Sequence, residues 1–380
     1  MLLAPLLLLA VIWIIFPAPN RHFWLLSIGV GEWSLWFGAL AVLCVAGAIA
    51  VRVLSGEGWL WIATAIVGTT AVVISLLPLL SVLPLARKYK LRLSLKRYFN
   101  GWPAKDFFFG YEPKDLTAHK FAACDGNDLH LDVYLPTAAT ENNGASVIVV
   151  HGGSWNGGTR SDFPRWNSWL AAQGFSVFDI DYRLAPQPNY STAVEDVKCA
   201  VRWIKSHAAE FDIDPGRVAL LGRSAGAQLA LLAAYSAGDV MESVRAAVSF
   251  YGPVDLLWAY DIRGYPRVHD GPLSLINFLG GRPGESEEMR ARYLAASPVN
   301  HVGPNTPPTF MTHGGRDQLV WWKNMYRLGE KLEAAAVPHE IHFIPYGRHG
   351  FDYNLNGWGS QIVGSLLLRF LAGHTQKKAG

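Results

Sequence analysis

A serine between two glycines is the first residue in the sequence that could act as a nucleophile. The segment Gly222-Arg223-Ser224-Ala225-Gly226 follows the apolar run 218–221 and leads into the helix-forming run 226–237. A serine on a tight turn between a buried strand and a helix needs small neighbours, because the backbone there is strained and the hydroxyl must stand clear of it. This placement favours Ser224 as a nucleophile over the alternative, an ordinary serine that caps a helix.

A second glycine-rich segment follows an earlier buried strand. His151-Gly152-Gly153-Ser154-Trp155 comes directly after the apolar run 147–150. Acyl transfer places negative charge on the former carbonyl oxygen, and backbone N–H groups that already point at that oxygen stabilise the charge. The amides of Gly152, Gly153 and Ala225 are expected to form this oxyanion hole, and a glycine-rich turn without a ligand is the alternative. The glycine spacing of phosphate-binding loops is absent.

Two later strands are each followed by a residue that could complete the chemistry. Asp317 and His349 both follow short apolar runs, and they come after Ser224 in the order serine, acid, histidine. In this arrangement His349 takes the proton from Ser224 and later gives it to the leaving alcohol, while Asp317 orients the imidazole and stabilises its charged form. Asp255 is the alternative acid.

Short apolar runs that alternate with helical stretches must position these residues. Strands are expected at 129–135, 147–150, 175–180, 218–221, 246–250, 309–312 and 341–344. Helices are expected at 164–173, 192–209, 226–237, 322–336 and 360–372. The alternation predicts an α/β fold, a mostly parallel sheet with helices on both faces, entered through an antiparallel hairpin that turns at Asp125-Gly126. In such sheets function lies at the carboxyl ends of the strands, where the candidate residues fall.

Taken together, residues 119 to 372 resemble the hormone-sensitive-lipase-like and carboxylesterase branch of the α/β-hydrolases. Besides the loops of Asp317 and His349, the resemblance is carried by His151-Gly152-Gly153-Ser154-Trp155, Asp181-Tyr182-Arg183-Leu184-Ala185-Pro186, Glu195-Asp196 and Asp214-Pro215-Gly216-Arg217-Val218-Ala219. It implies a catalytic triad of Ser224, Asp317 and His349 and an oxyanion hole of Gly152, Gly153 and Ala225. It also implies that Asp181, Arg183 and Asp196 brace the oxyanion loop through buried ion pairs.

The sequence departs from that family pattern beside the nucleophile. Ser154 stands in place of a third glycine, Arg223 in place of a frequent acid, and Ala227-Gln228 in place of glycine and histidine. The triad is intact, so the departures leave the subfamily open. The His-Gly-Gly-x-Trp segment also resembles kynurenine-formamidase-like enzymes, which keeps an aryl-formamide substrate as an alternative.

The aromatic segment 252–305 is the candidate for shaping the substrate pocket. Trp258 from this segment, together with Trp155 from the oxyanion loop, is expected to line the pocket. The alternative for the segment is packed surface without a role in binding.

The first 86 residues differ from the rest of the chain, because they contain only four charged side chains. Three apolar runs, 2–16, 23–51 and 59–77, show no polar face at helical spacing, and the second and third reach the roughly 20 residues that a spanning helix needs. We expect three membrane spans, with two as the alternative. A signal sequence fits the first run poorly, since it lacks a positive start and Pro17-Ala18-Pro19 is a poor cleavage site.

The sequence therefore divides into a transmembrane segment of about three helices (1–86), a basic juxtamembrane linker (87–118) and a hydrolase domain (119–374). Six cations follow the third run, at Arg87, Lys88, Lys90, Arg92, Lys96 and Arg97. The positive-inside rule places this linker, and the hydrolase domain of a multi-pass protein, in the cytoplasm. The same cations can also contact anionic head groups.

Composition and spacing restrict the other functions. The formal net charge is +3, without a long basic tract in the globular part or a zinc-finger spacing, so nucleic acid is not an expected partner. Cys44, Cys124 and Cys199 imply no disulfide framework. No metal or cofactor is expected, since His339-Glu340-Ile341-His342 does not have the metalloprotease spacing.

These patterns predict a membrane-anchored serine carboxylic ester hydrolase, an esterase or lipase that forms an acyl-enzyme on a small-molecule or lipid ester and has membrane lipids as partners. An arylformamidase-like amide hydrolase, an acyltransferase on the same triad and a binding module without catalysis are the alternatives. The physiological ester and the oligomeric state are left open.

Overall fold

One eight-stranded sheet positions the site, and its strands are β1 (Thr117–Ala122), β2 (Asp128–Tyr134), β3 (Ser146–Val150), β4 (Ser176–Ile180), β5 (Val218–Arg223), β6 (Ala246–Phe250), β7 (Thr309–Gly314) and β8 (His339–Ile344). Their order is β1-β2-β4-β3-β5-β6-β7-β8, antiparallel from β1 to β4 and parallel thereafter. The computed structural model describes residues 3–55, 60–100, 116–122, 128–137, 140–185, 189–262 and 264–375. The expected turn at Asp125-Gly126 and linker residues 101–115 lie outside the described residues.

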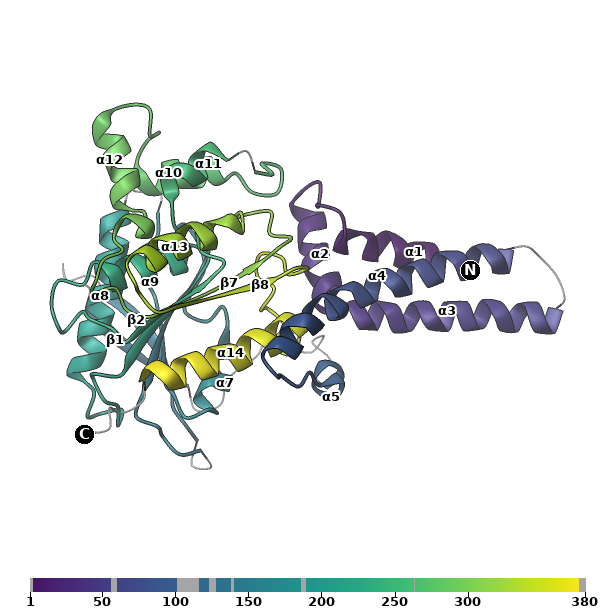
Figure 1. Cartoon of the computed structure of the whole chain (residues 1–380), viewed down its shortest axis with the longest axis horizontal. Coiled ribbons are helices and arrows are strands. Elements are labelled where there is room, and N and C mark those ends of the chain that lie inside the picture. Colours follow the sequence, from purple (N-terminus) through teal and green to yellow (C-terminus); the bar gives the residue numbers. More distant parts are fainter. Residues whose placement is uncertain are drawn as a thin grey trace.

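Helices cover both faces of this sheet, as Figure 1 shows. On one face lie α7 (Pro164–Ala171) and α14 (Trp358–Thr375), and on the other lie α8 (Tyr190–Ser206), α9 (Ala225–Tyr235) and α13 (Lys323–Ala334). Every residue of β3 is buried because its alternate side chains enter the two cores. Val147 and Val149 pack on the side of α7 and α14, whereas Ile148 and Val150 pack on the side of α8 and α9. The predicted α/β architecture, a mostly parallel sheet with helices on both faces, is confirmed.

Between β6 and β7 the chain forms a cap of three short helices. These are α10 (Leu256–Asp261), α11 (Gly271–Leu279) and α12 (Glu287–Ala295), followed by the 3₁₀ turn η2 (Pro298–Asn300). The carboxylates of Asp255 and Asp270 and the hydroxyl of Ser286 accept hydrogen bonds from the first turns of the three helices, which fixes where each helix begins. The cap therefore has defined helix starts, although its helices are short.

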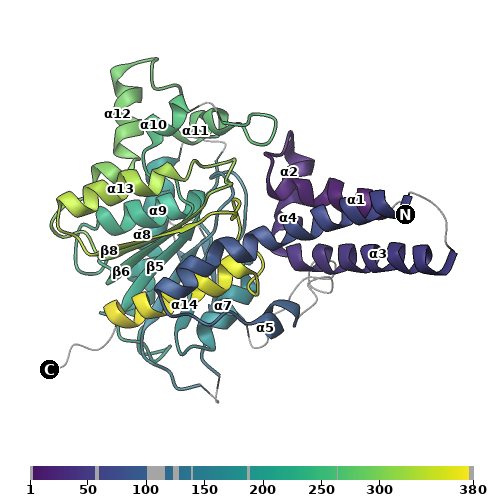
Figure 2. The same cartoon turned by 45° about the vertical axis from the view of Figure 1, so that its right-hand side comes forward.

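The N-terminal helices project away from the hydrolase domain (Figures 1 and 2). They are α1 (Leu3–Val11), the 3₁₀ turn η1 (Ile12–Ile14), α2 (Arg21–Glu32), α3 (Ser34–Ser55), α4 (Leu60–Lys88) and α5 (Leu95–Phe99). Within the described residues, two stretches, Ser34–Leu54 and Leu60–Lys88, are long and apolar enough to cross a membrane.

The expectation of three spans therefore gives way to its alternative of two. The run 23–51 divides at Trp33, where α2 ends in a non-helical backbone conformation and α3 begins a residue later. The first run yields a helix of nine residues, too short for a bilayer. The third run is longer than expected, because α4 continues to Lys88 and so includes the first two cations of the linker.

The C-terminal end of α4 is part of the hydrolase core. Val82 and Ala86 are buried in the same cluster as Trp358 of α14 and Tyr98 of α5. Tyr98 is 1 % exposed, stacks on Trp358 with ring centroids 4.3 Å apart, and accepts a hydrogen bond from the backbone N–H of Leu35 at the start of α3 (3.1 Å). Tyr98 therefore joins α3 to the face of the sheet that α14 covers.

Replacing Tyr98 with alanine is expected to lower the free energy of unfolding by about 3–5 kcal/mol, because a buried ring is deleted and leaves a cavity. Tyr98→Phe keeps the stacked ring and loses one hydrogen bond, so it is expected to cost about 1 kcal/mol. Denaturant unfolding of both variants in detergent, followed by tryptophan fluorescence, measures the difference. Equal losses would show that the stacking with Trp358 does not contribute.

Candidate active site

The turn that carries Ser224 is strained in the way a nucleophile's turn requires. Ser224 has φ 54° and ψ −122°, a conformation that side chains rarely adopt, and its N–H donates to the carbonyl of Phe250 on the neighbouring strand (2.9 Å). A Cβ on Gly222 would lie 2.2 Å from the carbonyl oxygen of Gly226, and one on Gly226 would lie 2.2 Å from that of His151. Both glycines are therefore required by close backbone contact.

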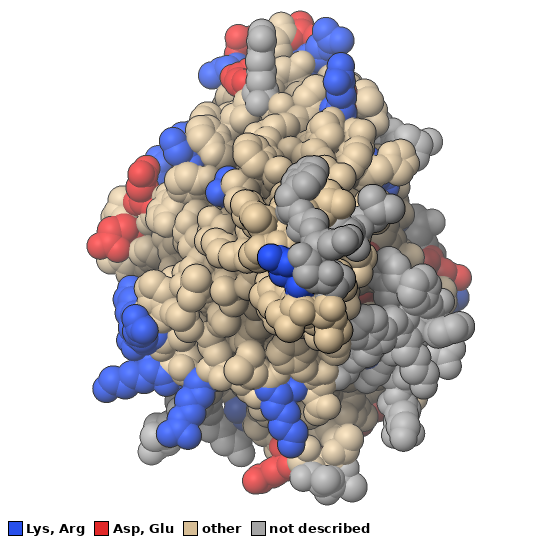
Figure 3. All heavy atoms as spheres, turned by 90° about the vertical axis from the view of Figure 1, so that its right-hand side faces the viewer, with Lys and Arg blue, Asp and Glu red and all other residues tan. Residues whose placement is uncertain are grey.

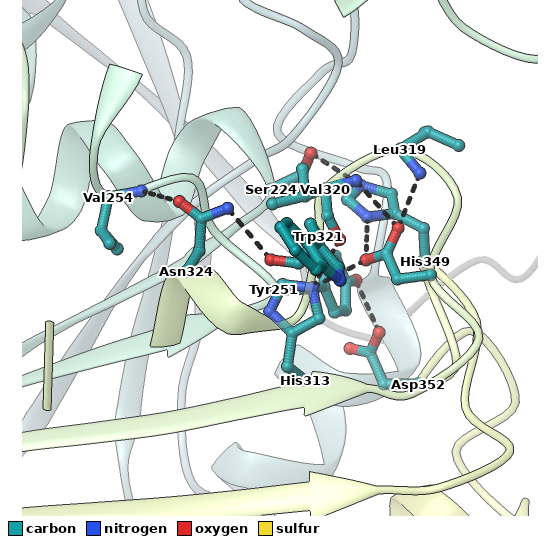
Figure 4. A network of polar contacts seen from close by, with 11 residues as sticks. Ser224, Tyr251, Val254, His313, Leu319, Val320, Trp321, Asn324, His349 and Asp352 are labelled. Carbon is teal, nitrogen blue, oxygen red and sulfur yellow. Dashed lines mark hydrogen bonds and ion pairs between the residues drawn. The ribbon is translucent and has the colours of Figure 1, made fainter. Parts of the chain in front are cut away.

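Ser224, His349 and Asp317 form one chain of hydrogen bonds, and Figure 4 shows Ser224 and His349 facing each other. The Nε2 atom of His349 lies 2.8 Å from the hydroxyl of Ser224, and its Nδ1 atom lies 2.7 Å from Oδ2 of Asp317. Oδ1 of Asp317 accepts the backbone N–H groups of Leu319 (2.8 Å) and Val320 (2.9 Å). The structure thus brings together the three residues that the sequence placed in a triad.

The carboxylate of Asp317 is buried yet stays ionised. Burial alone raises its pKa, but the electrostatic interaction with His349 and hydrogen bonds from His313 and His349 hold the pKa of Asp317 below its ordinary value. Nε2 of His313 lies 3.0 Å from Oδ2 of Asp317 and 2.9 Å from the carbonyl oxygen of Val320. His313 therefore acts as a second histidine partner of the acid, which the sequence analysis did not identify.

The alternative acid, Asp255, is committed elsewhere. One of its oxygens accepts the N–H of Trp258 at the start of α10 (3.0 Å), and the other pairs with the guanidinium of Arg327 (2.6 Å). It forms no hydrogen bond with His349 in the described part of the chain. Of the two candidate acids, Asp317 is therefore the one that forms a hydrogen bond with His349.

The glycines of the oxyanion loop lie against the nucleophile. A Cβ on Gly152 would lie 3.2 Å from Cβ of Ser224, and Gly153 has φ +117° with its would-be Cβ 2.0 Å from the carbonyl of Gly157. The backbone N–H groups of Gly152, Gly153 and Ala225 donate to no other described residue. Among the described residues these three amides are therefore unpaired, and Gly152 lies directly against Ser224.

Ion pairs brace this loop, partly through residues that the sequence did not single out. Arg183 pairs with the fully buried Asp196 (2.5 Å), whereas Asp181 pairs with Arg160 (2.6 Å), which also contacts Asp132 (2.8 Å). Asp181 therefore acts through Arg160, on the loop that follows the glycines, and not through Arg183. A signal was present, since Arg160 lies seven residues beyond Gly153, but its partners are distant in sequence: Asp132 lies in β2 and Asp181 directly follows β4.

A buried ion pair lies directly beneath the histidine. Arg223, 1 % exposed, donates through Nε to Oδ2 of Asp352 (2.7 Å), and Oδ1 of the same carboxylate accepts the hydroxyl of Tyr251 (2.6 Å). The ring of Tyr251 lies 4.6 Å from that of His349. Burial and the charge of Asp352 raise the pKa of Tyr251, so its hydroxyl stays a donor. The sequence analysis did not identify this role of Asp352.

The reactive hydroxyl opens into a cavity of about 810 Å³. Trp155 lines it and is held by a hydrogen bond from its ring N–H to Gln228 (2.8 Å) and by stacking on Phe278 (4.5 Å between ring centroids). The cap contributes Pro253, Ala259, Tyr260, Ile262, Gly264, Tyr265, Pro266, His269, Asp270, Gly271, Pro272, Ser274 and Leu275. The segment 252–305 therefore shapes the pocket.

Trp258, the other expected pocket residue, does not line this cavity. Its ring stacks on Trp321 with centroids 5.4 Å apart, and Trp321 lines the cavity in its place. Arg327 covers the ring of Trp258 at 4.5 Å. Asp255, which directly precedes α10 and pairs with the same arginine, thereby holds Trp258 against α13 and away from the pocket.

In the described part of the chain, no cluster of three His, Cys, Asp or Glu residues could hold a metal ion.

Fold and geometry define an α/β-hydrolase. Residues 131–332 match the BD-FAE family model, so the chain belongs to the BD-FAE family. Two relatives from Mycobacterium tuberculosis are each 30 % identical: the probable carboxylic ester hydrolase LipM over 239 residues (60 % of this chain, 54 % of the relative) and the esterase LipQ over 247 residues (60 % and 55 %). This chain spans about half the length of the curated relatives it matches.

Solved structures share the fold of the hydrolase domain. An acetyl ester-xyloside bifunctional hydrolase from Caldicellulosiruptor lactoaceticus is 25 % identical, with a TM-score of 0.54 over 65 % of this chain and 88 % of that chain. A bacterial heroin esterase is 24 % identical, with a TM-score of 0.60 over 69 % and 84 %. The similarity extends over about two-thirds of this chain.

Replacing Asp352 with alanine is expected to lower the free energy of unfolding by about 3–5 kcal/mol, because the guanidinium of Arg223 is left buried without a counter-charge. The matched control is Asp128→Ala, which breaks the exposed pair with Lys120 (2.6 Å, side chains more than half exposed) and is expected to cost less than about 1 kcal/mol. Denaturation midpoints in detergent compare the two. Similar costs would contradict the account of the buried pair.

Proposed function

We propose that this chain hydrolyses carboxylic esters through an acyl-enzyme on Ser224. The hydrogen-bond chain from Ser224 through His349 to Asp317, at the base of the cavity, is the observation that carries the proposal. The relatives named as carboxylic ester hydrolase and esterase support the same chemistry.

The geometry suggests how each proton moves. As the hydroxyl oxygen of Ser224 bonds to the ester carbonyl carbon, Nε2 of His349 takes the hydroxyl proton, and the charge on the carbonyl oxygen is stabilised by the amides of Gly152, Gly153 and Ala225. His349 then gives the proton to the departing alcohol, whose C–O bond breaks to leave the acyl-serine. Water then attacks the acyl-serine. His349 takes a proton from the water as its oxygen bonds to the acyl carbon. The bond to Ser224 then breaks, the acid is released, and His349 returns the proton to Ser224.

Replacing Ser224 with alanine is expected to lower kcat by about 10⁴ to 10⁶-fold, because the acyl group then has no oxygen to bond to. Ser274→Ala is the matched control, since Ser274 lines the same cavity but its hydroxyl donates to the carbonyl of Asp270 (3.1 Å). Hydrolysis of p-nitrophenyl acetate and labelling by a fluorophosphonate probe provide the readouts. Retained activity and labelling in Ser224→Ala would refute the assignment, and acyl transfer to an added alcohol in preference to water would identify an acyltransferase.

We further propose that α3 and α4 anchor the hydrolase domain in a membrane. Only 17 % of the apolar window of α3 and 33 % of that of α4 is buried, whereas a core helix of a soluble protein would be mostly buried. Leu43, Val53 and Leu54 are 67 %, 76 % and 86 % exposed. Figure 3, which faces this end of the molecule, shows a broad and mostly uncharged surface with basic atoms near its middle and both basic and acidic side chains around its edges. Such a surface fits a bilayer better than water.

Two observations bear on the side of the membrane, and they point in opposite directions. With two spans, Arg21 and the six linker cations lie on the side of the hydrolase domain, which favours the cytoplasm by the positive-inside rule. Cys199 is disulfide-bonded, and disulfides are typical of oxidising compartments. We propose the cytoplasmic placement, because the cations directly flank α4 and topology follows such charges.

Protease added to inside-out membrane vesicles is therefore expected to digest the hydrolase domain, since the domain then faces the solution. Right-side-out vesicles should protect it until they are opened with detergent. Immunoblotting for the domain measures both. Protection in the inside-out vesicles with digestion in the right-side-out vesicles would place the domain outside and agree with the disulfide.

A further inference from the structure

One wall of the reactive cavity comes from the N-terminal segment and not from the hydrolase domain. Pro17, between η1 and α2, lines the same cavity as Ser224. The cap residues Tyr265 and Pro266 line it as well, and the N–H of Arg21 donates to the carbonyl of Arg267 in the same part of the cap (3.2 Å). Figures 1 and 2 both show the start of α2 beside the loop between α10 and α11.

Buried side chains hold this segment against the loops of the acid and the histidine. Oε1 of Gln318 accepts the N–H of Ala18 (2.8 Å), and its Nε2 donates to the carbonyl of Ala18 (3.0 Å). The guanidinium of Arg348 donates to the carbonyl oxygens of Trp13 and Phe16 and to Oε1 of Gln318 (2.8 Å). Gln318 is the residue after Asp317, and Arg348 is the residue before His349. The wall therefore has a fixed position relative to the reacting groups.

The same segment lies where the bilayer surface is expected. Twenty residues of helix span about 30 Å, which is the thickness of the hydrocarbon core. Counted from Leu60, α4 therefore leaves the hydrocarbon core on the side of the hydrolase domain close to Leu80. Leu80 is 51 % exposed, whereas Val82 is 1 % exposed in the hydrolase core. α3 begins at Ser34 on the same boundary, and α2, which directly precedes it, runs across the helix bundle in Figures 1 and 2.

Apolar side chains are exposed beside the mouth of the cavity. Phe16 is 53 % exposed, and on α2 Phe23, Leu25 and Leu26 are 40 %, 54 % and 42 % exposed. At the bilayer surface these side chains contact acyl chains, as aromatic and apolar residues of interfacial helices do. An acyl chain that moves from the bilayer past Pro17 therefore leaves these apolar side chains for a cavity whose lining includes Ile262, Leu275 and Trp155.

From this placement we infer that the substrate is a long-chain ester of a membrane-resident amphiphile, which enters the cavity directly from the bilayer between Pro17 and Tyr265. This inference rests on the proposed ester hydrolysis at Ser224. It adds the class of substrate and the route of entry. The acyl chain enters along the wall that contains Pro17, and the ester carbonyl binds next to the hydroxyl of Ser224.

The test uses the full-length protein in phosphatidylcholine vesicles and two substrates, a long-chain fluorogenic ester embedded in the vesicles and water-soluble p-nitrophenyl acetate. Pro17→Asp places a charge on the entry route, and the ratio of the embedded-ester rate to the soluble-ester rate is expected to fall about tenfold, which corresponds to about 1.4 kcal/mol. The matched control is Pro19→Asp, in the same segment, because Pro19 is exposed but does not line the cavity. Its ratio is expected to stay at the wild-type value.

A second variant, Tyr265→Asp, changes the opposite side of the mouth and is expected to lower the same ratio even if Pro17→Asp fails to fold. Fluorophosphonate labelling of Ser224 in each variant shows that the reacting groups are intact. A wild-type protein that hydrolyses the soluble ester but not the embedded one, or ratios that fall equally for Pro17→Asp and Pro19→Asp, would overturn this inference alone. A wild-type protein that hydrolyses neither ester and takes no label would overturn the ester hydrolase itself.

Discussion

The hydrogen bond between Asp317 and His349 depends on two loops that lie backbone to backbone. β7 and β8 are parallel neighbours, and beyond the paired residues Gly314 and Ile344 the loops stay in contact: Gly315 N–H donates to Ile344 and Arg316 N–H to Gly347. A Cβ on Gly314 would lie 2.3 Å from the carbonyl oxygen of Gly347. These glycines therefore let the loops approach closely enough for a carboxylate and an imidazole to meet.

Three buried carboxylates around this contact share a second constraint, which is that each has a partner of its own. Asp317 has two histidines and two amides, Asp196 has Arg183, and Asp352 has Arg223. Unpaired, any of these charges would be costly to bury. Their pairing also fixes loops on either side of Ser224, so that the rigidity of the site and the stability of the fold have the same source.

Most of the fold and the main reacting groups could be predicted from the sequence, because both depend on local patterns. Continuous apolar runs such as 147–150 mark strands that are buried on both faces, and chemistry follows directly after such strands. The pairing of Arg223 with Asp352 could not be predicted, because it joins residues 129 positions apart and the nucleophile motif that contains Arg223 does not indicate a partner for it. The break at Trp33 was missed as well, since hydropathy alone does not show where an apolar helix ends.

The unbroken course of α4, from the distal end of the bundle to Ala86 in the hydrolase core, has a mechanical consequence. Since each helical residue adds about 1.5 Å and no loop intervenes, the pocket cannot move along the axis of α4 independently of this helix. Under the proposed membrane anchoring, a thicker or thinner bilayer is then accommodated by tilting of the whole molecule or by deformation of the surrounding lipid. Under the same proposal, membrane thickness sets the height of the pocket above the bilayer.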